Sequence, residues 1–271
     1  MSGGALIAAL PMYDDPGIAA ANDALWAAIA AGLREQGVEA PLRLTRGGDP
    51  AAQWLSLRLV FGQTCGYPYV KHLQDAVALI ATPAYAFPGC EGVEHRSFLI
   101  ARTRDSRRTL AAFRGAVAAV NAHDSNSGMN LFRATIAPIA SGPRFFGGVA
   151  VTGSHCASLE AVANGRADLA AIDCVSFALL KRFAAGLVAS VAIVAESPPS
   201  PGLPFIISAR LPETTLTAAR EALFAALADP DLAQARAAVG VRGARPATPA
   251  DYERILEIER EAERVGYPRL I

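Results

Sequence analysis

Short apolar runs alternate with helical patterns along most of this chain, and this alternation constrains the fold more than any other feature. Runs rich in Ala, Val, Ile and Leu indicate buried strands, whereas apolar residues three and four positions apart indicate helices. We expect strands at 5–13, 41–46, 77–85, 95–104, 115–121, 146–153 and 168–175, separated by helical patterns that include 22–37 and 51–59. The alternation predicts βαβ units and therefore an α/β fold of mostly parallel sheets flanked by helices.

Two segments rich in Pro and Gly differ from the ordinary turns of the chain, and they lie at 82–95 and 196–205. Proline fixes its own φ angle and favours an extended conformation in the residue before it. Two stiff, extended segments about a hundred residues apart predict two crossover strands between two lobes. We therefore expect one lobe from 1–95 and 206–271, with a second lobe, 96–205, inserted into it.

The composition argues against several classes of function. The 271 residues include 25 basic and 25 acidic side chains, and the basic residues form no stripe such as nucleic-acid binding requires. The apolar runs are all shorter than the roughly 20 residues that span a bilayer. We expect a monomeric globular protein that binds no nucleic acid and does not insert into a membrane.

The cysteines, Cys65, Cys90, Cys156 and Cys174, form no CxxC pair and show no metal-ligand spacing, although Cys156 follows His155. Buried free thiols are the simpler interpretation, and they suit a reducing compartment. The chain contains neither a GxGxxG loop nor a P-loop. We therefore predict no metal and no cofactor.

The first fifteen residues, MSGGALIAALPMYDD, lack the basic region and the long apolar region of a secretory leader. As written, the sequence predicts a cytoplasmic protein. If a leader precedes this sequence, a periplasmic location is expected instead.

Short polar side chains gather in the segment VNAHDSNSGMN, 120–130, where a predicted strand gives way to a helical pattern. One interpretation is a loop with a helix N-cap, since Ser, Asp and Asn accept hydrogen bonds from the first N–H groups of a helix. The other is an anion site, since those N–H groups and the helix dipole attract negative charge. In the second interpretation Ser125 and Ser127 surround an anion together with the main-chain N–H groups of 126–128.

Polar side chains also follow the other predicted strands. Tyr13 follows the first strand and is equally consistent with a rim residue that packs on its own lobe. Gln63 and Tyr67 lie in GQTCGYPY, which by itself is more simply a glycine-containing turn before a helix. His155 and Asp173 follow two later strands, and a carboxylate that ends a buried run needs a partner. Because ligands of open α/β sheets bind beyond the carboxyl ends of strands, we expect these side chains to face a cleft.

At these residues the chain resembles the phosphonate-type substrate-binding proteins of ABC transporters. The matching stretches are GQTCGYPY (62–69), VNAHDSNSGMN (120–130), GSHCASLEAVANGRADLAAIDCVSFALL (153–180) and ESPPSPGLPF (196–205). The resemblance implies the two-lobed type 2 periplasmic-binding-protein fold. It also implies binding of a small phosphorus oxyanion (phosphonate, phosphite or phosphate) between the lobes, and an ABC permease as a possible partner.

In proteins of this kind a Ser-x-Ser-Gly helix start holds the phosphoryl oxygens. Ser125 and Ser127 match that motif here. The resemblance further implies that the pocket is completed by Tyr13, Tyr67, His155 and Asp173, with Gln63 and Asn126 as additional contacts.

The carboxylate of Asp173 would repel a fully ionised phosphate and would favour a ligand with a proton or an ammonium group. Binding without catalysis is the function we expect. The alternative is a cytoplasmic lyase-type enzyme on the same fold, as in menaquinone or thiamin-precursor synthesis, with His155 or Asp173 as the base.

Overall fold

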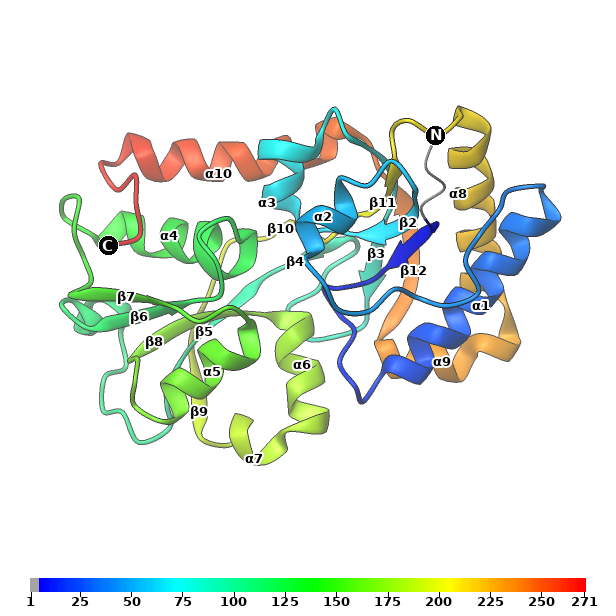
Figure 1. Cartoon of the computed structure of the whole chain (residues 1–271). Coiled ribbons are helices and arrows are strands. Elements are labelled where there is room, and N and C mark those ends of the chain that lie inside the picture. The colour runs from blue at the N-terminus through cyan, green and yellow to red at the C-terminus, as the bar shows by residue number, and fades with distance from the viewer. Residues whose placement is uncertain (1–4) are drawn as a thin grey trace. The chain divides into compact units, whose positions relative to one another are not determined.

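The computed structural model describes residues 5–271, which form two compact units (Figure 1). The first unit consists of the described residues up to Ala86 together with Gly202–Tyr252. The second consists of Phe87–Pro201 and Glu253–Ile271. Residues 1–4, which the predicted first lobe includes, lie outside the described residues. Each unit contains a five-stranded sheet with its own hydrophobic core.

The sheet of the first unit has the order β1-β2-β11-β3-β12. Its strands are β1 (Ile7–Ala9), β2 (Leu59–Gln63), β11 (Phe205–Ser208), β3 (Val77–Tyr85) and β12 (Val241–Pro246). Its helices are α1 (Ala19–Glu35), α2 (Pro50–Trp54), α3 (Gly66–Pro68), α8 (Glu213–Ala228) and α9 (Ala233–Val239), with a π-helical turn at Tyr69–Leu73 and 3₁₀ turns at Pro230–Leu232 and Pro249–Tyr252. Helices α1, α8 and α9 lie together beside this sheet in Figure 1.

Small residues let α1 and α8 approach closely. A Cβ atom built on Gly32 of α1 would lie 3.1 Å from the Cβ of Ala222 on α8, so a larger side chain at position 32 would push the helices apart. Trp26 and Phe61 fill the space between helices and sheet, with ring centroids 5.7 Å apart. This core supports the edge of the sheet where β2 ends.

The sheet of the second unit has the order β7-β6-β8-β5-β9. Its strands are β7 (Gly148–Val151), β6 (Val117–Val120), β8 (Leu169–Asp173), β5 (Ser97–Arg102) and β9 (Val191–Glu196), and a separate ribbon pairs β4 (Glu94–His95) with β10 (Ser200–Pro201). Its helices are α4 (Leu131–Ile136), α5 (His155–Ala163), α6 (Cys174–Phe183), α7 (Ala185–Val188) and α10 (Glu253–Arg264), with a π-helical turn at Asn126–Asn130 and 3₁₀ turns at Leu110–Phe113 and Ala137–Ile139.

The prediction of mostly parallel sheets is wrong at the level of strand pairing. In the first sheet only β1 and β2 pair in parallel, and in the second β6 pairs in parallel with β7 and β8. The remaining pairs in these sheets are antiparallel. Strand β11 lies between β2 and β3 and runs against both, β5 lies between β8 and β9 and runs against both, and β12 runs against β3. Four strands of the second sheet nevertheless point the same way, so β6, β7 and β8 end at one edge.

The C-terminal segment also departs from the prediction, which placed all of 206–271 in the first lobe. Residues Glu253–Ile271 belong to the second unit, where Ile255, Ile258 and Ala262 of α10 are buried. Asn130 donates a hydrogen bond to the carbonyl of Ile255 at 3.2 Å, and the main-chain N–H of Phe145 donates to Ile271. The apolar face of α10 thus packs against the second core rather than the first.

Two local predictions in the first unit need correction as well. The segment 41–46 is not a strand, although the N–H of Thr45 donates a hydrogen bond to the carbonyl of Ala8. The helix predicted at 51–59 is the shorter α2, which ends at Trp54. Asp49 caps its start by accepting a hydrogen bond from the N–H of Ala51, as an N-cap residue does.

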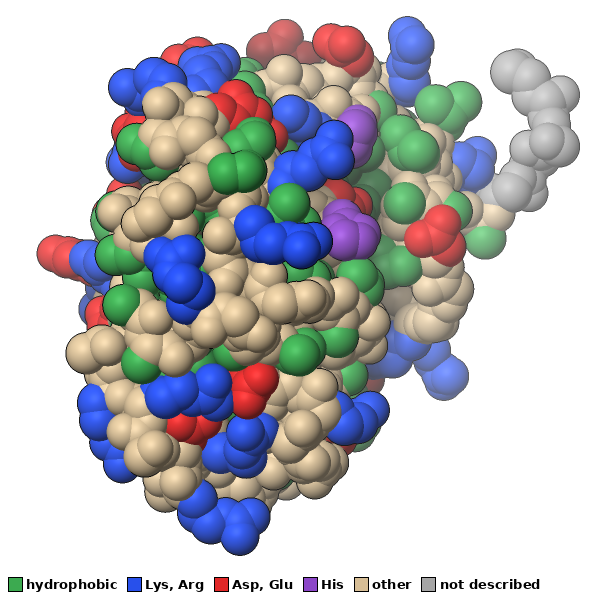
Figure 2. All heavy atoms as spheres, turned by 90° about the vertical axis from the view of Figure 1, so that its left-hand side faces the viewer, with side chains coloured by type: hydrophobic (Ala, Val, Ile, Leu, Met, Phe, Trp, Pro, Cys, Tyr) green, Lys and Arg blue, Asp and Glu red, His purple; other side chains and the backbone are tan. Residues whose placement is uncertain are grey.

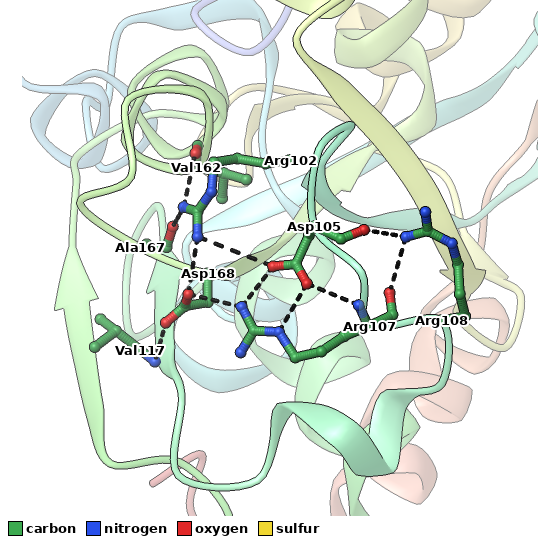
Figure 3. Close-up of polar contacts among 8 residues, drawn as sticks. All are labelled: Arg102, Asp105, Arg107, Arg108, Val117, Val162, Ala167 and Asp168. Carbon is green, nitrogen blue, oxygen red and sulfur yellow. Dashed lines mark hydrogen bonds and ion pairs between the residues drawn. The ribbon is translucent and has the colours of Figure 1, made fainter.

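A network of ion pairs stabilises the end of the second sheet where β6 and β8 begin (Figure 3). Asp168, just before β8, accepts hydrogen bonds from Arg107 at 2.8 Å and from Arg102 at 3.1 Å. Its other oxygen accepts one from the N–H of Val117, at the start of β6, at 2.9 Å. Asp105 forms a second ion pair with Arg107, at 2.5 Å. The network therefore connects the beginnings of two neighbouring strands.

Within residues 5–271 no helix is long and apolar enough to cross a membrane. On the face shown in Figure 2, Lys and Arg side chains are scattered among other residue types rather than gathered into one stripe.

Candidate functional site

The strand β6 leads into the segment that carries Ser125 and Ser127. Ser125 is the N-cap of the π-helical turn Asn126–Asn130, and its Oγ accepts a hydrogen bond from the N–H of Gly128 at 3.0 Å. Helix α4 continues directly from this turn. In the first turn of such a helical run the N–H groups have no acceptor inside the helix, so they attract an anion. The N-cap and the anion-site interpretations are therefore compatible.

A side chain at position 128 of this turn would collide with Asn121 as it is placed here. A Cβ atom there would lie 1.8 Å from Oδ1 of Asn121 and 3.2 Å from Cε1 of His155. The first of these distances is far below van der Waals contact, so any side chain would displace Asn121 or the turn itself. Gly128 thus allows the turn to lie directly against the His155 ring.

Ser127 and His155 come together from two different strand ends. His155 begins α5, whose N-cap Ser154 follows β7 and accepts a hydrogen bond from the N–H of Ala157 at 3.0 Å. Nε2 of His155 lies 2.9 Å from Oγ of Ser127, a hydrogen bond between the two side chains. One of the two groups donates in this bond and the other accepts, so while the bond is made only one of them can also donate to an oxyanion. Neither group carries a formal negative charge.

Asp173 ends β8 and is buried, with both carboxylate oxygens in contact with the protein. Oδ1 accepts a hydrogen bond from the N–H of Ser176 at 2.8 Å, which makes Asp173 the N-cap of α6. Oδ2 lies 2.7 Å from Nδ1 of His95, and both side chains are only 2% exposed. His95 comes from the short strand β4 and neutralises the carboxylate.

The pKa values of the three ionisable groups follow from these contacts. Burial alone would raise the pKa of Asp173, but His95 outweighs burial and holds the pKa of this carboxyl below its usual range. Burial alone would lower the pKa of His95, but the Asp173 carboxylate raises it above its usual value. Burial lowers the pKa of His155, and the Asp173 charge opposes this without reversing it. These contacts thus favour the charged forms of His95 and Asp173 and the neutral form of His155.

Asn126 lies in the same turn, but its side chain is occupied within the second unit. Its Nδ2 donates to Oγ of Ser200 at 2.8 Å, and its Oδ1 accepts from Nδ2 of Asn130 at 3.1 Å. Ser97 reaches the turn from β5 and donates to the carbonyl of Ser127 at 2.9 Å. These contacts hold the turn in place from two sides.

The predicted residues of the first unit form a separate group. Tyr13 packs edge to face on Tyr85, with ring centroids 5.5 Å apart. Gln63, at the end of β2, donates to the hydroxyl of Tyr85 at 3.3 Å and to the carbonyl of Leu203 at 3.2 Å. Tyr13, Gln63 and Tyr85 line one side of a small apolar cavity of about 40 Å³. Tyr67 belongs to another element, α3, where the ammonium group of Lys71 lies 5.5 Å from its ring centroid.

Sequence reasoning missed His95, Ser97 and Tyr85. His95 lies in a two-residue strand whose pairing partner, Ser200, is 105 positions away, so no local pattern marks it. The one available signal is its place as the last residue of the Pro- and Gly-rich segment 82–95. Across residues 5–271, no group of three His, Cys, Asp or Glu side chains is arranged to hold a metal ion.

Two α/β units, each with helices around a mixed sheet, define the class of two-lobed periplasmic binding proteins, and this confirms the predicted fold class. Over residues 8–252 the chain matches the family model described as "ABC transporter, phosphonate, periplasmic substrate-binding protein". The chain belongs to this family, as its sequence motifs predicted. Proteins of this family bind substrates for ABC uptake and are periplasmic. No curated protein sequence matches the chain.

Several solved structures share the fold at low sequence identity. The binding protein component of an ABC phosphonate transporter (PA3383) from Pseudomonas aeruginosa has a TM-score of 0.77 and 15% identity, over 96% of this chain and 87% of that one. XAC2383 from Xanthomonas citri, bound to chloride ion, has a TM-score of 0.74 and 16% identity, over 96% and 98%. PhnD1 from Prochlorococcus marinus, in complex with methylphosphonate, has a TM-score of 0.72 and 14% identity, over 95% and 98%.

Proposed function

We propose that this protein binds a small phosphorus oxyanion at the Ser127–His155 pair and delivers it to an ABC permease. One observation carries the proposal most directly: a hydroxyl and an imidazole from two strand ends lie 2.9 Å apart at the start of a helical run. Hydroxyl, imidazole and main-chain N–H donors hold phosphoryl oxygens without any lysine or arginine. Family membership supports the same ligand class.

The state of Asp173 narrows the choice of ligand. A carboxylate that faced the ligand would favour an ammonium group, as the sequence suggested. Instead, one oxygen of Asp173 caps α6 and the other is paired with His95. A ligand ammonium would have to compete with the buried imidazole for that carboxylate. We therefore propose a phosphonate, phosphite or phosphate without an amino group as the preferred ligand.

The enzymatic alternative receives less support from the same contacts. Asp173 would be a weak base, since its pKa lies below the usual range and its oxygens are already occupied. His155 keeps its Nε2 on Ser127. We propose that the bound ligand is released unchanged, and phosphorus NMR of the ligand after prolonged incubation would detect any conversion.

Tyr13, Gln63 and Tyr67 of the first unit remain proposed ligand contacts. Asn126 is better described as a residue that positions the turn.

We propose that the protein acts as a monomer in the periplasm, in keeping with the periplasmic location of its family. Cell fractionation would test the location, and light scattering of the purified protein would test the monomeric state.

Thermal unfolding of the phosphate-free protein in the presence of phosphate, phosphite, methylphosphonate, 2-aminoethylphosphonate and sulfate would test the proposal. A ligand at about 100 times its Kd adds about 2.7 kcal/mol to the unfolding free energy, which raises Tm by several degrees. We expect that rise with at least one phosphorus oxyanion and a smaller one with the amino-substituted compound.

Ser127→Ala should weaken binding of the best ligand by about 10- to 100-fold, the usual loss for a hydrogen bond to a charged group. Ser158→Ala is a matched control, because it removes a buried hydroxyl of α5 that lies 2.6 Å from Oγ1 of Thr152 and not at the Ser127–His155 pair. Isothermal titration should show unchanged affinity for this control. If none of the phosphorus oxyanions raises Tm, the proposal is wrong.

A further inference from the structure

Two of the free cysteines lie against each other in the second unit. Sγ of Cys90 is 3.4 Å from Sγ of Cys174, although the residues are 84 positions apart in sequence. A disulfide bond is about 2.05 Å long, so the two sulfur atoms need to approach by only about 1.4 Å. Cys174 is buried and Cys90 is partly exposed. The sequence suggested four buried thiols, whereas Cys174 alone is buried.

The chain around Cys90 is held against α6 by more than the thiols. Gly89 has a φ angle of +88°, and a Cβ atom there would lie 2.8 Å from the Cβ of Cys174 and 2.9 Å from the ring of Phe98. Only glycine combines this angle with this close approach. Phe87 adds a second attachment, because the guanidinium of Arg182 on α6 lies 4.7 Å from its ring centroid. The segment 87–90 therefore keeps the two sulfur atoms near each other.

We propose that Cys90 and Cys174 are a disulfide-forming pair, oxidised reversibly by thiol–disulfide exchange. With glutathione disulfide as oxidant, the Cys90 thiolate attacks one sulfur atom and releases the first glutathione thiolate. The Cys174 thiolate then attacks Sγ of Cys90 and releases the second. Two electrons pass from the two cysteines to the oxidant, and the two thiol protons end on the glutathione and the solvent.

The surroundings of the pair set the order of these steps. Cys90 offers the accessible sulfur, and Cys174 is covered. The hydrogen bond with Cys90, burial and the Asp173 carboxylate together raise the pKa of the Cys174 thiol. A buried thiol with a raised pKa does not start the exchange but can complete it once the neighbouring sulfur is activated. A thiol–disulfide exchange that begins at Cys90 therefore ends with a disulfide between Cys90 and Cys174.

The bond would join residues 84 positions apart within the second unit, one inside the segment 82–95 and one at the start of α6. Cross-links of long loops stabilise a fold mainly by restricting the unfolded chain. Because Cys174 follows Asp173 directly, the same bond would fasten the peptide that carries the Asp173 carboxylate.

The test is to incubate the native full chain with mixtures of reduced and oxidised glutathione, block the remaining thiols and digest with trypsin. Cleavage places Cys90 in peptide 72–96 and Cys174 in peptide 167–181, whereas Cys65 and Cys156 fall in 59–71 and 145–166. We expect a cross-link between 72–96 and 167–181, a mass loss of two hydrogen atoms per chain, and full reversal by dithiothreitol. The oxidised protein should unfold several degrees higher than the reduced one.

The double variant Cys65→Ser, Cys156→Ser is the matched control and should form the same cross-link. Cys90→Ser should form none, and should lose the rise in Tm on oxidation; because its side chain is partly exposed, this variant should fold. Glutathione that stays on Cys90, a cross-link to Cys65 or Cys156, or unchanged reactivity of both thiols would each overturn the proposal.

Discussion

Strand β8 has an aspartate at each end, and the protein treats the two carboxylates differently. Asp168, just before the strand, is about one quarter exposed and is held by Arg102 and Arg107. Asp173, the last residue of the strand, is buried and is held by His95. Two acidic groups a few residues apart on one element thus differ in burial and in the chemistry of their partners.

The two ends of β8 differ in how the charge of the partner side chain responds to pH. Arginine stays protonated at any pH near neutral, so the network at the start of β8 is a constant, partly solvated structural feature. Histidine releases its proton near neutral pH, so the charge balance at the end of β8 depends on conditions. The imidazole partner leaves Ser127 and His155 beside a neutralised carboxylate, which is the environment that an oxyanion needs.

The substitution Asp173→Asn should lower the unfolding free energy the most, and it therefore tests whether the two carboxylates of β8 differ as described. Removing one partner of a buried ion pair costs about 3–5 kcal/mol, because the other partner stays desolvated without compensation. Asp168→Asn at the other end should cost only about 1 kcal/mol, as partly exposed pairs do. Urea unfolding of both variants with unchanged m-values would measure the two losses. Equal losses would contradict the assigned difference between the two ends.

The second largest expected difference between the two ends of β8 is in the pH dependence of the unfolding free energy. The folded state raises the pKa of His95, so the folded protein binds this proton more tightly than the unfolded chain does. The stabilisation by this proton is complete below the ordinary histidine pKa of about 6.5 and is lost as pH rises through the folded value. The unfolding free energy should therefore fall between about pH 6 and pH 8 in the wild type.

Asp173→Asn is the comparison variant. Without the carboxylate the pKa of His95 is no longer raised, so the unfolding free energy of this variant should not fall between pH 6 and pH 8.

The effect of His155 has the opposite sign, because the folded state lowers its pKa. Its contribution to the unfolding free energy is lost only as pH falls below about 6.5. A wild-type unfolding free energy that rises from pH 6 to pH 8 would show that His95 is neutral in the folded protein.

Ser127, His155 and Asp173 could be predicted to lie close together because each follows a strand of the same sheet. The carboxyl ends of β6, β7 and β8 meet at one edge, and a strand followed by Ser, His or Asp is visible in a single sequence. His95 could not be predicted in this way. Its position depends on the pairing of β4 with β10, a long-range contact that leaves no periodic pattern.

Long-range contacts also limited the prediction of the fold. The apolar stripe of α10 predicts that one face of the helix is buried, and Ile255, Ile258 and Ala262 are buried. The stripe does not indicate which core receives it, and the prediction assigned it to the wrong unit. Likewise 41–46 has the composition of a strand, but it is not one, although Thr45 bonds to Ala8 of the edge strand β1.

The smallest expected effect concerns the other acidic member of the arginine network, Asp105. Its hydrogen bond with Arg107 lowers the pKa of this carboxyl to about 2. A lowered pKa means that Asp105 contributes stability above its ordinary value of about 3.9 and loses it as pH falls towards 2. Asp105→Asn should cost about 1 kcal/mol near neutral pH, after allowance for solvent screening, and should flatten the acid dependence of unfolding between pH 5 and pH 3.

Salt should then distinguish this network from the buried pair. About 1 M sodium chloride shortens the screening length to roughly 3 Å, which weakens interactions between solvated charges far more than those between buried ones. Asp168 is the more exposed acidic member of the network, so the difference between wild type and Asp168→Asn should shrink at high salt. The difference between wild type and Asp173→Asn should persist. If salt reduced both differences by the same fraction, the His95–Asp173 pair would be as solvated as the arginine network, and the neutral environment inferred for Ser127 and His155 would not exist.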